Sequence, residues 1–344
     1  MSKPAPTPED VVTGVEKAME LLADGDVRGA TSAWRRLMVK APKAPEVIVL
    51  EGMIALQDGA VEEALKAYEK ASLLAPDFPL PLVLAAELCL DDLEDPDRAL
   101  EFCDKAAKVA DDDETLAEVL LIRTDAHIEL NDVEQVRNCY EALAKLPIDD
   151  PEYFQRVGEV AAVIEDYPAA KSWFAKALDG DPQNADAWHG LGSAYEALGD
   201  RDKMVEAWLK TRDIDSEDGD PPWHLTRKDF EKVAEKALAG LPKEILEKLK
   251  GVAVLIEDEP SEELVRDGVD PRILGLFSGT PATEKETMSG QPSEPDSIRI
   301  FQRNIEGSCE DQDQLVDEIR ITVLHETAHY FGLGDDALDA MGLG

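Results

Sequence analysis

One periodic column of residues constrains this chain more than any other feature. Apolar residues recur along the first two-thirds of the sequence at spacings of 34, 35, 37, 34 and 34. The members of this column are Ala30, Ala64, Ala99, Val136, Ala170 and Met204. A period near 34 residues is typical of stacked helix pairs, because each pair buries its apolar face only against its neighbours. The sequence therefore predicts about six helix pairs over residues 11–216.

A second column lies four residues after the first, one turn further along the same helix face. Large rings fill all of its positions except one, and its members are Trp34, Tyr68, Cys103, Tyr140, Phe174 and Trp208. A third column, twelve residues after the first, holds Pro42, Pro76 and Pro182. Proline just past a helix end stops the helix and sets the turn into the next repeat. We interpret the rings as packing between helices and not as a ligand site.

The clearest first helix of a pair reads Trp188-x-x-Leu191-Gly192-x-x-Tyr195. Together with the columns, it resembles the tetratricopeptide repeat (TPR) at that family's most characteristic positions. The resemblance implies an all-α helical-repeat solenoid over residues 1–216, with a surface that binds a protein partner.

The chain changes character after the repeats. Residues 215–222 read DSEDGDPP, and acidic residues with glycine and a proline pair are typical of a break between folding units. We predict a linker at residues 217–225 and a second domain over residues 226–344. Three short apolar runs, at residues 252–256, 273–277 and 298–301, are strand candidates within it. The expected fold is thus multidomain, a helical-repeat array followed by a small α+β domain.

The charge and the cysteines limit the partners and the compartment. The formal net charge of -40, from 75 acidic and 35 basic residues, would repel a phosphate backbone or an anionic membrane face. We expect no nucleic-acid or membrane partner, and we favour solubility over attraction of basic proteins as the reason for the charge. Four scattered cysteines without a C-x-x-C pair, and the lack of a secretion signal or membrane span, predict a cytoplasmic protein.

A metal-binding motif stands near the end of the chain. His325-Glu326-x-x-His329 continues an apolar helix pattern that begins at Leu315. Histidines four residues apart lie one turn apart, so both imidazoles can bind one Zn²⁺ at about 2.0–2.1 Å. Glu326 then points into the adjacent cleft, as the general base for a zinc-activated water. The other histidines, His127, His189 and His224, have no partner at ligand spacing.

A third zinc ligand is expected after a turn at Gly332, because glycine can take the left-handed conformation that ends a helix. Asp335 stands ten residues after His325, where the metzincin pattern H-E-x-x-H-x-x-G-x-x-H has its last histidine. A carboxylate is an acceptable zinc ligand. Asp336 is the competing candidate.

Residues 226–344 resemble the small bacterial zincin-like metallopeptidase family. The matching segments are Leu241-Pro242, the strand at 252–256, the LGLFSG segment at 274–279 and the HETAHYFGL segment at 325–333. The resemblance implies a minimal zincin fold in which His325, His329 and Asp335 bind zinc.

Two functions follow from these features. The first is a zinc peptidase whose repeats recruit a protein or peptide substrate or a protein partner. The second is a non-catalytic TPR interaction scaffold in which zinc only stabilises the small terminal domain. Glu326 favours the first hypothesis, because a structural zinc site needs no general base.

Overall fold

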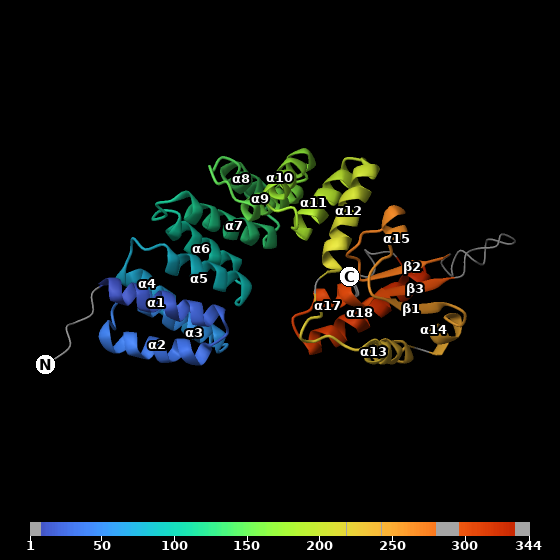
Figure 1. Cartoon of the computed structure of the whole chain (residues 1–344), viewed down its shortest axis with the longest axis horizontal. Coiled ribbons are helices and arrows are strands. Elements are labelled where there is room, and N and C mark those ends of the chain that lie inside the picture. Colours follow the sequence, from blue (N-terminus) through green and yellow to red (C-terminus); the bar gives the residue numbers. More distant parts are fainter. Residues whose placement is uncertain (1–7, 218, 242, 280–295, 334–344) are drawn as a thin grey trace. The chain divides into compact units, whose positions relative to one another are not determined.

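The structure is a computed structural model that describes residues 8–217, 219–241, 243–279 and 296–333 (Figure 1). Contacts between Cα atoms divide the chain into two compact units, Met1–Lys176 and Ala177–Gly344. The boundary between the units falls inside helix α10 (Tyr167–Gly180). The second unit therefore contains the last helix pair together with the α+β region, and the linker expected at residues 217–225 stays a prediction.

Helices in pairs make up residues 8–215, as the repeat period predicted. The first helices of the pairs are α1 (Pro8–Ala23), α3 (Pro45–Gln57), α5 (Leu80–Asp91), α7 (Asp113–Glu129), α9 (Pro151–Val163) and α11 (Ala185–Ala197). The second helices are α2 (Val27–Lys40), α4 (Val61–Leu74), α6 (Pro96–Ala106), α8 (Val133–Leu143), α10 and α12 (Arg201–Asp215). Every member of the first sequence column is the fourth residue of a second helix and is buried. The repeat period therefore arises from buried positions that recur once in each helix pair.

Aspartates start several of the second helices. The side chains of Asp26, Asp95 and Asp132 each accept a hydrogen bond from a backbone N–H in the first turn of α2, α6 and α8. Such a cap satisfies a donor that has no partner inside the helix and contributes about 1 kcal/mol. Part of the acidic composition therefore has a local structural role.

Three rings of the second column pack against a glycine on the other helix of their pair. A Cβ atom at Gly52 would lie 2.4 Å from Cε1 of Tyr68, and a Cβ at Gly158 would lie 2.9 Å from Cε1 of Phe174. In each pair the glycine stands sixteen residues before the ring. The same spacing leads to Gly192 before Trp208, but to Ala18 before Trp34, Thr124 before Tyr140 and Glu87 before Cys103.

The α+β region contains a three-stranded sheet in the order β1-β3-β2. Its strands are β1 (Ala253–Glu257), β2 (Gly275–Ser278) and β3 (Ser297–Phe301), in agreement with the three strand candidates. Strand β1 pairs with β3 in parallel, and β2 pairs with β3 antiparallel. The helices of this region are α13 (Arg227–Ala239), α14 (Lys243–Lys248), α15 (Glu262–Arg266), α17 (Gln302–Gly307) and α18 (Gln312–Tyr330). The expected fold class is confirmed.

Helix α18 lies between the sheet and α13 (Figure 1). Ile298 and Ile300 of the central strand are fully buried and share one core with Ile319 and Val323 of α18 and with Phe230 of α13. Fully burying one such side chain stabilises the fold by about 1.5–3 kcal/mol. The central strand thus holds α18 against the sheet, and α18 carries the candidate site.

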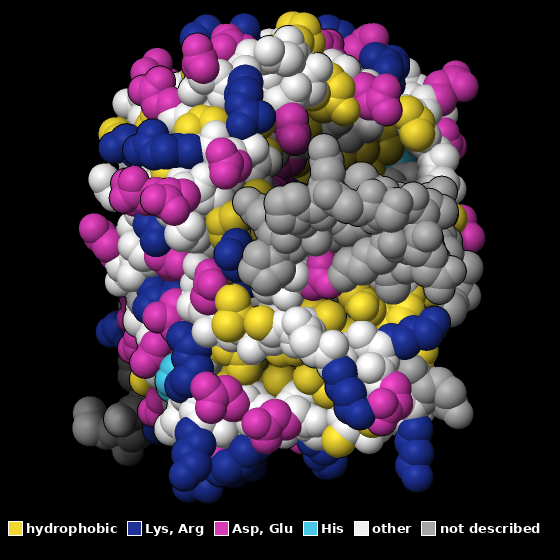
Figure 2. All heavy atoms as spheres, turned by 90° about the vertical axis from the view of Figure 1, so that its right-hand side faces the viewer, with side chains coloured by type: hydrophobic (Ala, Val, Ile, Leu, Met, Phe, Trp, Pro, Cys, Tyr) yellow, Lys and Arg dark blue, Asp and Glu magenta, His cyan; other side chains and the backbone are white. Residues whose placement is uncertain are grey.

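One face of the second unit carries both charged and apolar side chains. Figure 2 shows acidic and basic side chains interspersed on the face that lies to the right in Figure 1, with a group of apolar side chains near its middle. Within the described part of the chain, no helix combines the length and the apolar character needed to cross a membrane.

We predict that Gly52→Ala lowers the free energy of unfolding by about 1–2 kcal/mol, because overpacking against the buried Tyr68 ring outweighs the roughly 1 kcal/mol gained in helix propensity. Urea denaturation followed by circular dichroism measures this change. The double variant Gly52→Ala/Tyr68→Leu should lose less stability than the sum of the losses in the two single variants, since the smaller leucine side chain leaves room for the methyl group. Strictly additive losses would show that the ring does not require the glycine.

Candidate metal centre

The candidate site lies on α18, and the core fixes the rotation of this helix. Asp311 caps its first turn by accepting a hydrogen bond of 2.8 Å from the Gln314 N–H. Leu315, Ile319 and Val323 then face the core. The sequence predicted this apolar face, and the histidine motif follows it on the same helix.

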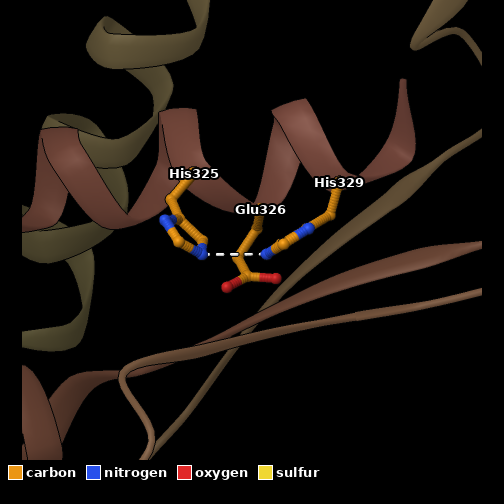
Figure 3. A group of neighbouring side chains, drawn as sticks. All are labelled: His325, Glu326 and His329. Atoms are coloured by element: carbon orange, nitrogen blue, oxygen red, sulfur yellow. Dashed lines mark hydrogen bonds between the residues drawn. The ribbon is translucent and has the colours of Figure 1, made fainter. Parts of the chain in front are cut away.

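The two histidines of the motif face each other (Figure 3). Nε2 of His325 lies 2.8 Å from Nε2 of His329. Bonds of about 2.0–2.1 Å to a tetrahedral zinc would place two nitrogen ligands about 3.3 Å apart, so a small side-chain rotation suffices. The potential ligand atoms of His325, Glu326 and His329 all lie within 4.8 Å of one another. Two imidazole nitrogens facing one point are donors that zinc accepts, so His325 and His329 fit the metal that the motif implies, with the Glu326 carboxylate beside it.

The chain turns directly after His329, as predicted. Gly332 adopts a φ of 79°, and the Leu333 N–H donates a hydrogen bond to the Ala328 carbonyl. This left-handed glycine ends the helix and brings the Leu333 carbonyl to 3.0 Å from Nδ1 of His329. A carbonyl at Nδ1 fixes the ring orientation and leaves Nε2 for a metal. Asp335 and Asp336 lie outside the described residues.

Glu326 is the buried member of the motif, with 6% of its surface exposed. Its side chain lies against the backbone of β2, since a Cβ atom at Gly275 would stand 2.6 Å from Cγ of Glu326 and 2.9 Å from Cγ2 of Thr322. Figure 3 shows the carboxylate between the two rings, on the side of the helix that faces the strands. Gly275 therefore allows α18 to approach the sheet closely enough to hold Glu326 in place.

A cavity of about 620 Å³ opens beside this group. Its walls are Ile273, Gly275 and Phe277 on the side of β2, and the three motif residues on the side of α18. Sequence reasoning identified the motif but gave Gly275 no role. The only signal for it was its place in the LGLFSG segment.

A separate group of ionisable residues lies on the first helices of three successive repeats. Glu87 and Asp91 of α5, Glu118 and Asp125 of α7, and Arg156 of α9 line a pocket of about 200 Å³. Burial, together with Glu118 and Asp91, raises the pKa of Glu87 to about 7. Burial also raises the pKa of Asp91, Glu118 and Asp125, although Arg156 bonds to Asp125 at 3.0 Å. This pocket favours a cationic group.

The comparisons with protein families agree with both parts of the structure. Residues 249–344 match the family described as zincin-like metallopeptidase. Residues 15–79 and 158–210 match the tetratricopeptide repeat. Both resemblances seen in the sequence are thereby confirmed. The comparison with curated proteins gave no match.

Solved structures resemble the repeat region. One, from a study titled as the functional characterization of Pseudomonas aeruginosa pilF, is 14% identical with a TM-score of 0.52, and the match covers 61% of this chain and 94% of that one. Another is PilW, described as a widely conserved type IV pilus biogenesis factor; it is 16% identical with a TM-score of 0.51, and the match covers 62% and 96%. At these identities the likeness shows the fold alone.

We predict that the repeat region loses stability as the pH rises from about 4.5 to 7. Glu87 has a folded-state pKa of about 7, above its ordinary value of 4.5, so the folded chain binds more protons than the unfolded chain in this window. The stabilising contribution of protonated Glu87 is complete below pH 4.5, and it is lost as the pH rises through the folded-state pKa of about 7.

Glu87→Gln should flatten this pH dependence, because the amide is neutral at every pH. Urea midpoints at about pH 5 and pH 8 measure the effect. The control is Glu101→Gln, which changes an exposed carboxylate of α6 and should leave the difference between the two midpoints unchanged. Equal pH profiles for Glu87→Gln and the wild type would contradict the prediction.

Proposed function

We propose that this protein is a zinc-dependent peptidase whose helical repeats bind its protein substrate or a protein partner. The observation that carries the proposal is the convergence of His325 and His329 beside the buried Glu326, on the wall of a cavity lined by β2. The match to the zincin-like metallopeptidase family supports it.

His325, His329 and Asp335 are the zinc ligands in this proposal. We assign Asp335 because it stands ten residues after His325, where the metzincin pattern has its third ligand, and because Gly332 ends the helix three residues before it. Zinc, when bound, lowers the pKa of a coordinated water toward about 7 and polarises a carbonyl. The Leu333 carbonyl keeps His329 in the orientation that this role needs.

Glu326 is the general base. Its carboxylate takes a proton from the attacking water and gives it to the amine nitrogen that leaves when the peptide bond breaks. A fixed position is necessary for both transfers, and the contacts with Gly275 and Thr322 provide it. The buried surroundings also limit the access of other water molecules to the carboxylate.

Strand β2 is the surface we propose for the substrate backbone. It is an edge strand among the described residues, paired only with β3, and it borders the cavity. An extended peptide can pair with the free edge of such a strand through backbone hydrogen bonds. A peptide bound there would cross the cavity in front of Glu326.

The repeats supply a second contact with a protein or peptide. The pocket formed by Glu87, Asp91, Glu118, Asp125 and Arg156 favours a lysine or arginine side chain on that partner, because four carboxylates there face one guanidinium. The cytoplasmic location stays a prediction. The alternative, a scaffold with a purely structural zinc, is less well supported, because it gives the buried Glu326 no role.

Glu326→Gln should abolish peptide cleavage, with kcat/KM at least about 10²-fold lower, because the amide cannot accept the proton. Its zinc content should stay equal to that of the wild type. Digestion of a peptide library, read by mass spectrometry, and metal analysis measure the two effects. Asp317→Asn, at an exposed position on the same helix, is the control and should cleave normally. A wild type that binds zinc but cleaves no peptide would support the scaffold instead.

Metal titration tests the ligand set. We predict one zinc per chain, none in His325→Ala/His329→Ala, and a strong loss of affinity in Asp335→Ala, which removes both a metal bond and a compensating charge. Asp336→Ala should stay within about tenfold of the wild type, the lower end of the effect of a supporting residue. A competing chelator measures all four affinities. Loss of zinc in Asp336→Ala alone would show that the register is wrong by one residue.

A further inference from the structure

The connection between β1 and β2, residues 258–274, packs on the last helix pair. Val265 of α15 is fully buried and shares an apolar cluster with Met204 and Trp208 of α12. In the upstream repeats, the second helix of one pair contacts the first helix of the next, as in the contacts of α2 with α3, α4 with α5, α6 with α7 and α8 with α9. Helix α15 takes that place on α12 (Figure 1). The connection therefore caps the last repeat, which would otherwise expose its apolar face.

Polar contacts fasten both ends of this connection to the last helix pair. Near its start, Arg212 of α12 donates to the Pro260 carbonyl at 2.7 Å and pairs with Glu259 at 2.8 Å. Near its end, His189 of α11 lies 2.9 Å from a carboxylate oxygen of Asp270. The connection is thus held by side chains of both helices.

Arg272 makes the most extensive of these contacts. Its Nε and Nη2 atoms donate to the two carboxylate oxygens of Asp215 at 2.8 and 2.9 Å, and its Nη1 atom donates to Asp186 at 2.6 Å. Burial lowers the pKa of this guanidinium, but the bonds to Asp215 and Asp186 outweigh it and raise the pKa above its ordinary value. Two parallel bonds to one carboxylate fix direction as well as distance.

A short stretch of chain leads from Arg272 to the cavity. The side-chain amide of Asn304 donates to the carbonyls of Pro271 and Ile273 at 2.8 and 2.7 Å, so the backbone on both sides of Arg272 is held. Ile273 lines the cavity, and Gly275 begins β2 against Glu326. A shift of Arg272 would therefore move the cavity wall that supports Glu326.

We infer that Arg272 is a positioning residue for the catalytic cavity: by binding Asp215 and Asp186 of the last helix pair, it fixes β2 and, through Gly275, the carboxylate of Glu326. The last helix pair is then a working part of the peptidase unit and not only a module for binding partners. The catalytic consequence rests on the proposed function, whereas the effect on β2 does not.

Hydrogen exchange in the full chain tests the effect on β2. In Arg272→Gln, peptides that span Gly275–Ser278 should exchange at least about tenfold faster, the factor expected when local opening becomes easier by about 1.4 kcal/mol. Peptides from α13 should exchange at the wild-type rate. Arg266→Gln is the matched control, because among the described residues that side chain bonds only to the exposed Glu262 of its own helix. Unchanged exchange in β2 of Arg272→Gln would overturn the inference, whatever activity the wild type shows.

Milder variants guard against misfolding. Arg272→Lys keeps the charge but loses the two-point bond, so its exchange rate should lie between those of the wild type and Arg272→Gln. Asp186→Asn removes the charge only from the outer bond and should have a smaller effect than Asp215→Asn, which weakens the two-point bond. Equal exchange rates in all of these variants would contradict a role for the bonds of Arg272.

Kinetics and metal binding separate this inference from the proposed function. Arg272→Gln should lower kcat by about 10- to 100-fold, the range expected when a catalytic group is misplaced, with KM and zinc affinity nearly unchanged. An active wild type with an unaltered kcat in Arg272→Gln would overturn the role in positioning Glu326. A wild type without peptidase activity, but with faster β2 exchange in Arg272→Gln, would refute the proposed function and support the fixing of β2 by Arg272.

Discussion

The close approach of α18 to the sheet is the constraint on which the candidate site depends. Val323 and Ile319 bury their side chains against the central strand, and this sets the rotation of the helix. Because the rotation is fixed, His325 and His329 lie at the edge of the buried face, and Glu326 lies within it. Gly275 completes the arrangement, since a Cβ atom there would come within 2.6–2.9 Å of the side chains of Glu326 and Thr322 and would displace them.

The sequence predicted much of this structure, because its strongest signals record local packing. The repeat columns mark positions on the second helix of each pair that recur with the repeat, and the three strand candidates match the strands closely. The roles of Arg272 and Gly275 were not predictable in the same way. Arg272 bonds to residues 57 and 86 positions earlier in the chain, and no periodic pattern relates such distant residues. The sequence also treated the repeats and the α+β region as separate, whereas α15 packs on α12.

The acidic composition has more than one physical origin. Some aspartates cap helices, where the charge is favourable because the first N–H groups of a helix lack partners. Others, such as Glu87, Glu118 and Asp125, lie where burial and, after it, repulsion from neighbouring carboxylates raise their pKa and so oppose ionisation. The first group stabilises the fold and the second costs stability near neutral pH. Solubility alone explains exposed carboxylates, but it does not account for this second group.

The burial of the Glu326 carboxylate at the candidate metal centre also needs a physical explanation. Burying a carboxylate removes it from water, and this desolvation costs free energy that an apolar side chain of similar size would avoid. A zinc ion that only stabilises a small domain needs its ligands and gains nothing from an additional buried acid beside them. A hydrolytic site, in contrast, needs a carboxylate that is fixed next to the reacting water, and it tolerates the loss of stability for that reason. In the proposed peptidase, the contact with Gly275 and the bonds of Arg272 would share one role, because both would limit the movement of Glu326, which must stand at a defined position to take the proton.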